Sequence, residues 1–269
     1  MRGALASRCL WLGLFAFACT AAIAVKVRSK STLRHGIADS AMQQAFETIY
    51  SDKVWGIDGG GSGSGSGEQA TQYARSILRL TIGMYGLKSM IDAPCGSLHW
   101  MPLALRDILT DVPGFQYLGV DIVRPVIEAH QKNFSAQSRN MHFKLLDFTD
   151  DILPDGYDLI FCRDALQHLP YDKVISALEH FATSSARYLL VTSYDRQDHN
   201  VDVPPGGYWD LDLQKHPFLL SGYQHDYREH TEEVLPSEAE KHLLLYSVTY
   251  LQSIYFVAMR QRAHQVVRL

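Results

Sequence analysis

Three aspartates follow buried, strand-like runs of the sequence, each just where the run ends. Asp92 closes KSMID, Asp121 closes FQYLGVD, and Asp147 comes directly after the run at 141–146. In nucleotide-binding folds, a carboxylate past the second strand accepts hydrogen bonds from ribose hydroxyls. Asp147 with Phe148 would pair an acceptor for an exocyclic amine with an aromatic face for a flat base. A lone aspartate is more often a cap or turn residue, but the repetition at one relative position predicts a nucleoside pocket.

The elements that must position these aspartates alternate along the chain. Strands are expected at 88–92, 115–121, 141–146, 157–162 and 186–193, and a closing antiparallel pair at 242–248 and 253–259. Helices are expected at 41–50, 70–86, 125–134 and over the run that carries Val174, Leu178 and Phe181. The alternation predicts an α/β fold with a doubly wound, mostly parallel sheet, whose ligands bind at the carboxyl ends of the strands.

One of these helices has a clear apolar periodicity. The residues that recur at helical spacing between 70 and 86 are Ala70, Tyr73, Ile77, Leu80 and Met84. This spacing predicts the face that the helix buries.

The composition fits a folded domain. Of the 269 residues, 46% are hydrophobic and 20% are charged, and the net charge is −4 without a basic run in the main body. We therefore find no nucleic-acid signature. Cys9 and Cys19 lie in an apolar N-terminal run, and Cys95 and Cys162 are too few for a disulfide framework and lack zinc-ligand spacing. No metal site is predicted.

The first residues resemble a targeting segment. The run from Cys9 to Val25 is uncharged and follows Arg2 and Arg8, which predicts a signal peptide or a signal anchor. Four basic residues between 26 and 34 disfavour translocation of the rest of the chain, so the topology stays open. We expect localisation to the secretory pathway or anchoring to an ER or Golgi membrane, with the membrane as a partner if the segment is uncleaved. The expected domains are a signal segment at 1–30, a stem at 31–54 and a folded domain at 55–269.

A tract of only glycine and serine runs from Gly59 to Gly67. As a linker it would need a domain before it, and the stem offers none. As a phosphate loop it would need G-x-G-x-x-G, but its glycines fall at alternate positions. The first strand also has a single following glycine, Gly96, which argues against a dinucleotide site.

Several motifs resemble those of one group of class I S-adenosylmethionine-dependent methyltransferases. The stretch Asp92–Gly96, followed by Trp100-Met101, resembles the group's D-A-P-C-G-x-x-x-W-M first motif. YLGVDIV at 117–123 resembles its second motif, and FCRDALQHL at 161–169 resembles its C-R-D-x-L-x-H-L segment. GGYWDLDLQ at 206–214 resembles its downstream G-x-Y-R-P-L-N-L segment. The resemblance spans about 55–246.

The resemblance implies a Rossmann-like methyltransferase fold with seven strands, S-adenosyl-L-methionine as cofactor, and methyl transfer to an unidentified acceptor. The group also carries a Gly/Ser segment before the first helix, so the tract is expected to be a loop over the cofactor end. With no side-chain packing to hold it, the empty loop is expected to be mobile. The sequence departs from the group at Ser97, where an acid is frequent, and at Trp209, Asp210 and Asp212.

The strand ends and the resemblance together predict the site. The expected cofactor-binding residues are Trp55, Gly63, Asp92, Ala93, Pro94, Cys95, Gly96, Trp100, Asp121, Ile122, Asp147, Phe148 and Arg163. Asp164 and His168 are the expected catalytic pair, with His168 as general base because an imidazole titrates near neutral pH. The alternative is that His168 packs against the following helix and Asp164 only orients a ligand. Cys95 and Cys162 are expected as neighbouring free thiols beside the pocket.

Two other functions remain open at this point. The departures around Trp209 would suit a catalytically silent nucleoside-binding protein of the same fold. A nicotinamide-dependent oxidoreductase is the third interpretation, and the missing glycine fingerprint argues against it.

Overall fold

The computed structural model describes residues 41–134, 139–196, 198–230 and 239–266. They belong to one compact unit that begins at Ala38. The predicted signal segment lies outside the described residues. Within the described ranges, no helix is both long and apolar enough to cross a membrane.

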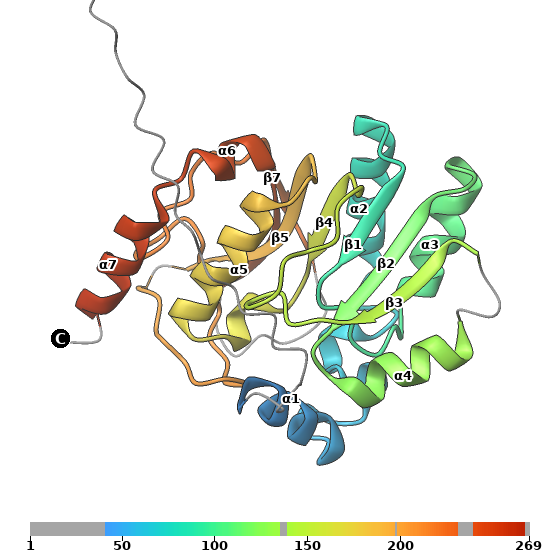
Figure 1. The fold of residues 1–269 in the computed structure, drawn as a ribbon, viewed down its shortest axis with the longest axis horizontal. Helices are drawn as coiled ribbons and strands as arrows, with labels where there is room; N and C mark the ends of the chain where they lie inside the picture. The colour runs from blue at the N-terminus through green and yellow to red at the C-terminus, as the bar shows by residue number, and fades with distance from the viewer. Residues whose placement is uncertain (1–40, 135–138, 197, 231–238, 267–269) are drawn as a thin grey trace, which may run out of the picture. The chain divides into compact units, whose positions relative to one another are not determined.

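Seven strands form one sheet in the order β3-β2-β1-β4-β5-β7-β6 (Figure 1). Their bounds are β1 Ser89–Asp92, β2 Gln116–Asp121, β3 Met141–Leu145, β4 Leu159–Cys162, β5 Tyr188–Asp195, β6 His225–Arg228 and β7 Glu240–Ser247. The strands β3, β2, β1, β4 and β5 pair in parallel, whereas β7 runs antiparallel to both β5 and β6. The predicted doubly wound α/β fold with seven strands and a C-terminal antiparallel pair is confirmed.

One member of that antiparallel pair was assigned to the wrong segment. The run at 253–259 was expected to be a strand, but the chain forms helix α6 at Val248–Gln252 and helix α7 at Phe256–Val266. Met259 and Ala263 of α7 are buried, four residues apart, as a helix requires. The partner of β7 is β6, a polar strand at the edge of the sheet whose residues are only half-buried or exposed.

Helices cover both faces of the sheet. Figure 1 shows α5 (Tyr171–Thr183) in front of the sheet, and α2 (Gln72–Tyr85) and α3 (Met101–Asp111) behind it. The apolar cluster behind the sheet also includes Ile127 of α4 (Arg124–Asn133), and the cluster in front includes residues of α6 and α7. The strands β1, β2, β4, β5 and β7 supply residues to both clusters, because successive side chains of a strand point to opposite faces.

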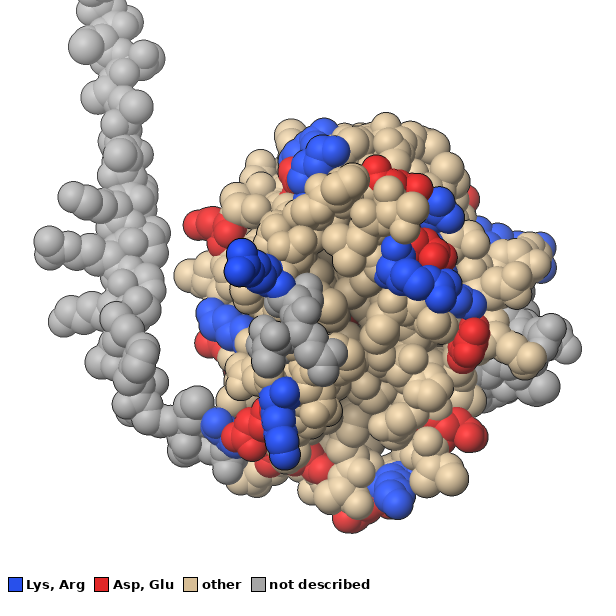
Figure 2. Space-filling view, turned by 90° about the vertical axis from the view of Figure 1, so that its right-hand side faces the viewer, with Lys and Arg blue, Asp and Glu red and all other residues tan. Residues whose placement is uncertain are grey.

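The remaining elements lie near the carboxyl ends of the parallel strands. Helix α1 (Ala41–Ser51) lies beyond these ends in Figure 1. Two short 3-10 helices, Asp58–Gly61 and Ser64–Ser66, form within the glycine tract, and a third spans Leu166–His168. On the face shown in Figure 2, basic and acidic side chains are interspersed, so that face carries no extended patch of one sign.

The buried face of α2 differs from the face that its periodicity predicted. Tyr73, Leu80 and Met84 are 48%, 51% and 53% exposed. The residues that pack against the sheet are Ala74, Ile77, Leu78, Thr81 and Ile82. The two sets share only Ile77, because the prediction followed a row of apolar residues through Tyr73 and Met84 and left out Leu78 and Ile82.

Two leucines of α2 provide a matched test of this packing. Leu78 is fully buried, so Leu78→Ala should lower the free energy of unfolding by about 2–5 kcal/mol. Leu80→Ala, on the exposed face, should change it by less than about 0.5 kcal/mol. Urea denaturation of the two variants measures both values, and equal losses would show that α2 packs through the other face.

Candidate active site

A pocket opens at the carboxyl ends of β1, β2, β3 and β4. It holds about 910 Å³ of free space, its open mouth included. All the predicted site residues line it except Gly63 and Ala93. Ala93 is buried beneath the pocket, where its N–H donates to the carbonyl of Phe161 at 2.9 Å. Gly63 lies in the tract beside Trp55, where an added Cβ would meet the Trp55 Cβ at 3.9 Å.

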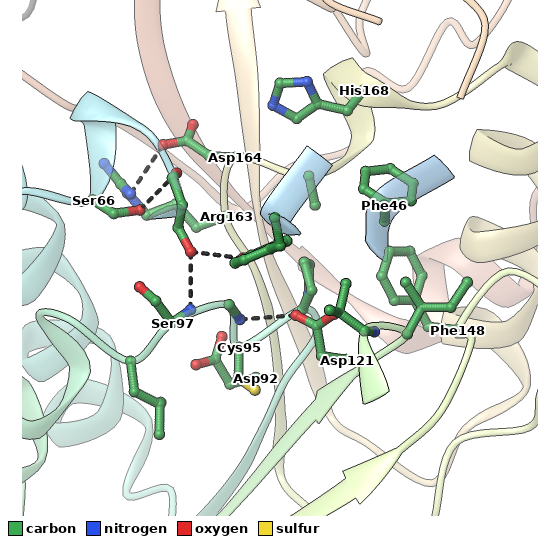
Figure 3. A pocket seen from close by; sticks show the side chains of 18 of the residues that line it. Phe46, Ser66, Asp92, Cys95, Ser97, Asp121, Phe148, Arg163, Asp164 and His168 are labelled. Atoms are coloured by element: carbon green, nitrogen blue, oxygen red, sulfur yellow. Dashed lines mark hydrogen bonds and ion pairs between the residues drawn. The ribbon is translucent and has the colours of Figure 1, made fainter. Parts of the chain in front are cut away.

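Helix α1 forms one wall of the pocket, which the sequence analysis missed. Met42, Phe46 and Tyr50 recur every four residues along α1 and all line the pocket. Figure 3 shows Phe46 and His168 on one side of the pocket, with Asp92, Cys95 and Asp121 on the other. The spacing of these three residues in AMQQAFETIY was a usable signal, but a stem was expected there and the helix was not connected with the site.

Asp121 lies at the end of β2 and is 3% exposed. Its Oδ2 accepts a hydrogen bond from the N–H of Gly96 at 3.0 Å, and its Oδ1 accepts one from the N–H of Val123 at 2.9 Å. Burial raises the pKa of Asp121 to about 6, although these backbone donors act in the opposite direction. Each carboxylate oxygen can accept a further bond from the pocket side.

Asp92, at the end of β1, is equally buried. The hydroxyl of Tyr117 donates to its Oδ2 at 2.7 Å. Burial raises the pKa of Asp92 to about 8, and the Tyr117 bond and Arg163 oppose that rise. A cation bound beside Asp92 and Asp121 would lower both pKa values, so this side of the pocket favours a positively charged ligand.

Asp147 and Phe148 follow β3 and line the pocket beside Ile122, as predicted. The Asp147 Oδ1 accepts bonds from the N–H and the hydroxyl of Thr149, at 2.9 and 2.7 Å. Burial raises the pKa of Asp147. The buried Phe148 ring packs 5.7 Å from the ring of Phe181, which fixes the aromatic face beside the pocket.

The glycine tract packs directly on the loop after β1. The Ser62 Oγ accepts the N–H of Ser97 at 2.9 Å and shares a 2.7 Å hydrogen bond with the Tyr50 hydroxyl. The Ser97 hydroxyl donates to the Gly59 carbonyl at 2.5 Å. A Cβ at Gly96, whose φ is +55°, would approach the Ser62 Oγ to 2.8 Å, so this contact requires glycine. The expectation that no side chain holds the tract is therefore wrong. Ser97 binds the tract through its N–H and its hydroxyl.

Three buried charges and one half-buried charge meet behind the tract; we call Arg163, Asp164, Glu229 and Lys241 the ionic cluster, in which Asp164 is the half-buried member. Arg163 bonds Asp164 through Nη1 at 2.9 Å and Glu229 through Nη2 at 2.5 Å. The Lys241 Nζ lies 2.5 Å from Asp164 and 3.5 Å from Glu229. A further Arg163 bond, from Nη2 to the Gly65 carbonyl at 3.1 Å, ties the cluster to the tract.

The ionic cluster determines what Asp164 can do. Burial alone would raise the pKa of Asp164, but Arg163 and Lys241 outweigh burial and lower it. A carboxylate with so low a pKa is a poor proton acceptor near neutral pH. Asp164 is therefore suited to be a fixed negative charge in the pocket wall.

His168 is the better candidate for a base. Its Nδ1 lies 2.8 Å from the Gly207 carbonyl, which can only accept, so Nδ1 carries the proton and Nε2 keeps its lone pair. Burial lowers the pKa of His168, which keeps the ring neutral near pH 7. The ring packs 4.6 Å from that of Trp55 and 5.5 Å from that of Tyr208.

The downstream segment at 206–214 contacts His168. Tyr208 and the carbonyl of Gly207 contact its ring, as described above. Arg196 lies 4.3 Å over the Trp209 ring and bonds Asp210 at 3.0 Å, so these two departures from the group form an internal contact. The backbone N–H of Asp212 donates to the Oδ1 of Asn200 at 2.8 Å.

The two cysteines of the domain are free thiols. The expectation that both lie beside the pocket is wrong. Cys95 lines the pocket and packs with the cluster behind the sheet, whereas Cys162 is buried in the cluster in front of it. Both belong to strand ends that are neighbours, but their side chains point to opposite faces.

Comparisons with known proteins agree with this architecture. Residues 91–186 match the family Methyltransf_12, described as a methyltransferase domain. The 1,6-didemethyltoxoflavin-N1-methyltransferase of Burkholderia thailandensis superposes with a TM-score of 0.54 at 14% identity, covering 77% of this chain and 86% of that one. The chain has the Rossmann-like methyltransferase fold.

Two other solved structures are similar at a lower level. The magnesium protoporphyrin IX methyltransferase of Synechocystis has a TM-score of 0.45 at 16% identity, over 65% of this chain and 77% of that one. Human N-acetylserotonin methyltransferase has a TM-score of 0.49 at 16% identity, over 76% of this chain and 59% of that one. No curated protein sequence matches the chain.

The ionic cluster can be tested by removing one of its charges. Glu229→Gln leaves Arg163 and Lys241 buried beside a single carboxylate, which should lower the free energy of unfolding by about 3–5 kcal/mol. Glu240→Gln is the matched control, because Glu240 also pairs with an arginine, Arg228, but at the surface, where a loss of about 1 kcal/mol or less is expected. Urea denaturation compares the variants. A loss for Glu229→Gln no larger than the control's would contradict the account of the cluster.

Proposed function

We propose that this chain is an S-adenosyl-L-methionine-dependent methyltransferase. The observation that carries the proposal is the Asp121 carboxyl, which lines the pocket at the end of the second strand. The N–H groups of Gly96 and Val123 donate hydrogen bonds to it and fix its position. A carboxylate in this position is the usual acceptor for ribose hydroxyls in such folds. The match of residues 91–186 to a methyltransferase domain supports the same reaction class.

The residues present fit this cofactor. Asp121 would hold the ribose, and Asp147 with Phe148 and Ile122 would hold the adenine between an acceptor and apolar faces. Asp92 and Asp164 suit the positive charges of the sulfonium and the amino group. When bound, the cofactor supplies an electrophilic methyl group.

The chain's own contribution is orientation and proton removal. His168, kept neutral by burial and held by the Gly207 carbonyl, would accept the acceptor's proton at Nε2. Asp164 would hold positive charge near the reaction without itself taking a proton. Helix α1 and Trp55 cover the pocket and would exclude water from it.

Titration with S-adenosylhomocysteine tests the proposal. The protein should bind this product and should not bind NAD, which needs a pyrophosphate site that the loop after β1 lacks. Asp121→Asn should weaken binding at least tenfold at pH 7.5, because hydrogen bonds to a charged group contribute about 1.5–3 kcal/mol each. The exposed Asp172→Asn is the control and should bind normally.

The pH dependence of the affinity for S-adenosylhomocysteine shows which protonation state of Asp121 binds it. Because the folded pKa of Asp121 is about 6, affinity should fall as the pH drops through about 6 and the carboxylate gains a proton. The Asp121→Asn variant should lack this step in isothermal titrations between pH 5 and 7. Binding of NAD in place of S-adenosylhomocysteine, or an unchanged Asp121→Asn variant, would overturn the proposal.

A further inference from the structure

The pocket wall has no spare positive charge. Arg163 is the only lysine or arginine among the lining residues that the structure describes. Its Nη1 bonds Asp164, its Nε and Nη2 bond Glu229, and Nη2 also donates to the Gly65 carbonyl. Lys241, behind it, is shared between the same two carboxylates. A carboxylate or phosphate entering the pocket would find both cations already neutralised.

The same wall carries several acids. Four aspartates line the pocket: Asp92, Asp121, Asp147 and Asp164. Asp164 is held ionised by its two cationic neighbours. Ionised carboxylates in a partly buried site repel an anionic acceptor, and no lining cation is left to pair with it, whereas the zwitterionic cofactor brings an ammonium that offsets its own carboxylate.

The part of the pocket around the candidate base is aromatic. The ring of Trp55 lies 4.6 Å from that of His168, and the ring of Phe46 lies 6.0 Å from that of Trp55, measured between centroids. These three residues line the pocket, and Figure 3 shows His168 on the side away from Asp121. Aromatic faces bind flat rings by offset or edge contacts.

We propose that the methyl acceptor is a flat aromatic or heteroaromatic compound that carries no carboxylate or phosphate and presents an O–H or N–H to His168 Nε2. This inference rests on the proposed function and adds the class of acceptor. During transfer the acceptor's oxygen or nitrogen bonds to the methyl carbon, and its proton passes to Nε2. The electron pair of the broken C–S bond stays on the sulfur of the departing S-adenosylhomocysteine.

Matched acceptor fragments test the proposal by binding, without requiring turnover. The full-length protein is first saturated with S-adenosylhomocysteine, and that titration alone decides whether the proposed function fails. The complex is then titrated with two pairs that differ by one carboxylate: 2-naphthol against 6-hydroxy-2-naphthoate, and 5-hydroxyindole against 5-hydroxyindole-2-carboxylate. The neutral member of each pair should bind at least tenfold more tightly, with a Kd below about 1 mM.

A charge variant examines the cause of this preference. Phe46 is half-buried, so Phe46→Lys can place an unpaired ammonium at the pocket while its stem covers the apolar wall. It should shift the affinity ratio at least tenfold toward the carboxylates, whereas the control Phe46→Met should keep the wild-type preference. The proposal is overturned if the carboxylates bind the wild type as tightly as the neutral fragments. It is also overturned if the saturated complex binds no neutral fragment, or if Phe46→Lys leaves the ratio unchanged.

Discussion

The ionic cluster is the constraint on which the arrangement of this site depends. Buried charges are tolerated only when each one is paired, and here two cations face two carboxylates with side-chain exposures between 0% and 20%. The four residues come from the end of β4, the start of β7 and the segment after β6. Pairing them joins β7 and the segment after β6 to the end of β4, and the Arg163 bond to the Gly65 carbonyl joins the cluster to the glycine tract. These pairs fix Asp164, while the Gly207 carbonyl holds the neighbouring His168.

The parallel strands could be predicted because burial dominates their sequences. Central strands such as LIFC of β4 are buried on both faces and read as continuous apolar runs. β6, HDYR, is an edge strand and carries no such signal. The run at 253–259 has strand-like composition, but Met259 and Ala263 are needed on one face of a helix, and tertiary packing overrides composition there.

The site was predictable where chemistry follows the strand ends. Asp121 and Asp147 could be found because parallel strands end at one edge of the sheet. Glu229 and Lys241 could not, since nothing in the local sequence shows that they would meet Arg163 from far along the chain. The contacts of the Ser62 hydroxyl could not be predicted, because its partners, Tyr50 and Ser97, come close only when the loops are folded together.

The central claim is that one pocket at the strand ends binds the methyl donor with its reactive end toward Asp164 and His168. A crystal structure of the protein with S-adenosylhomocysteine tests it most directly. The account predicts both ribose hydroxyls within hydrogen-bonding distance of the Asp121 carboxylate, the adenine beside Phe148, and the thioether sulfur facing the side of the pocket that holds His168. A nucleoside bound away from Asp121, or a sulfur directed away from His168, would contradict the account.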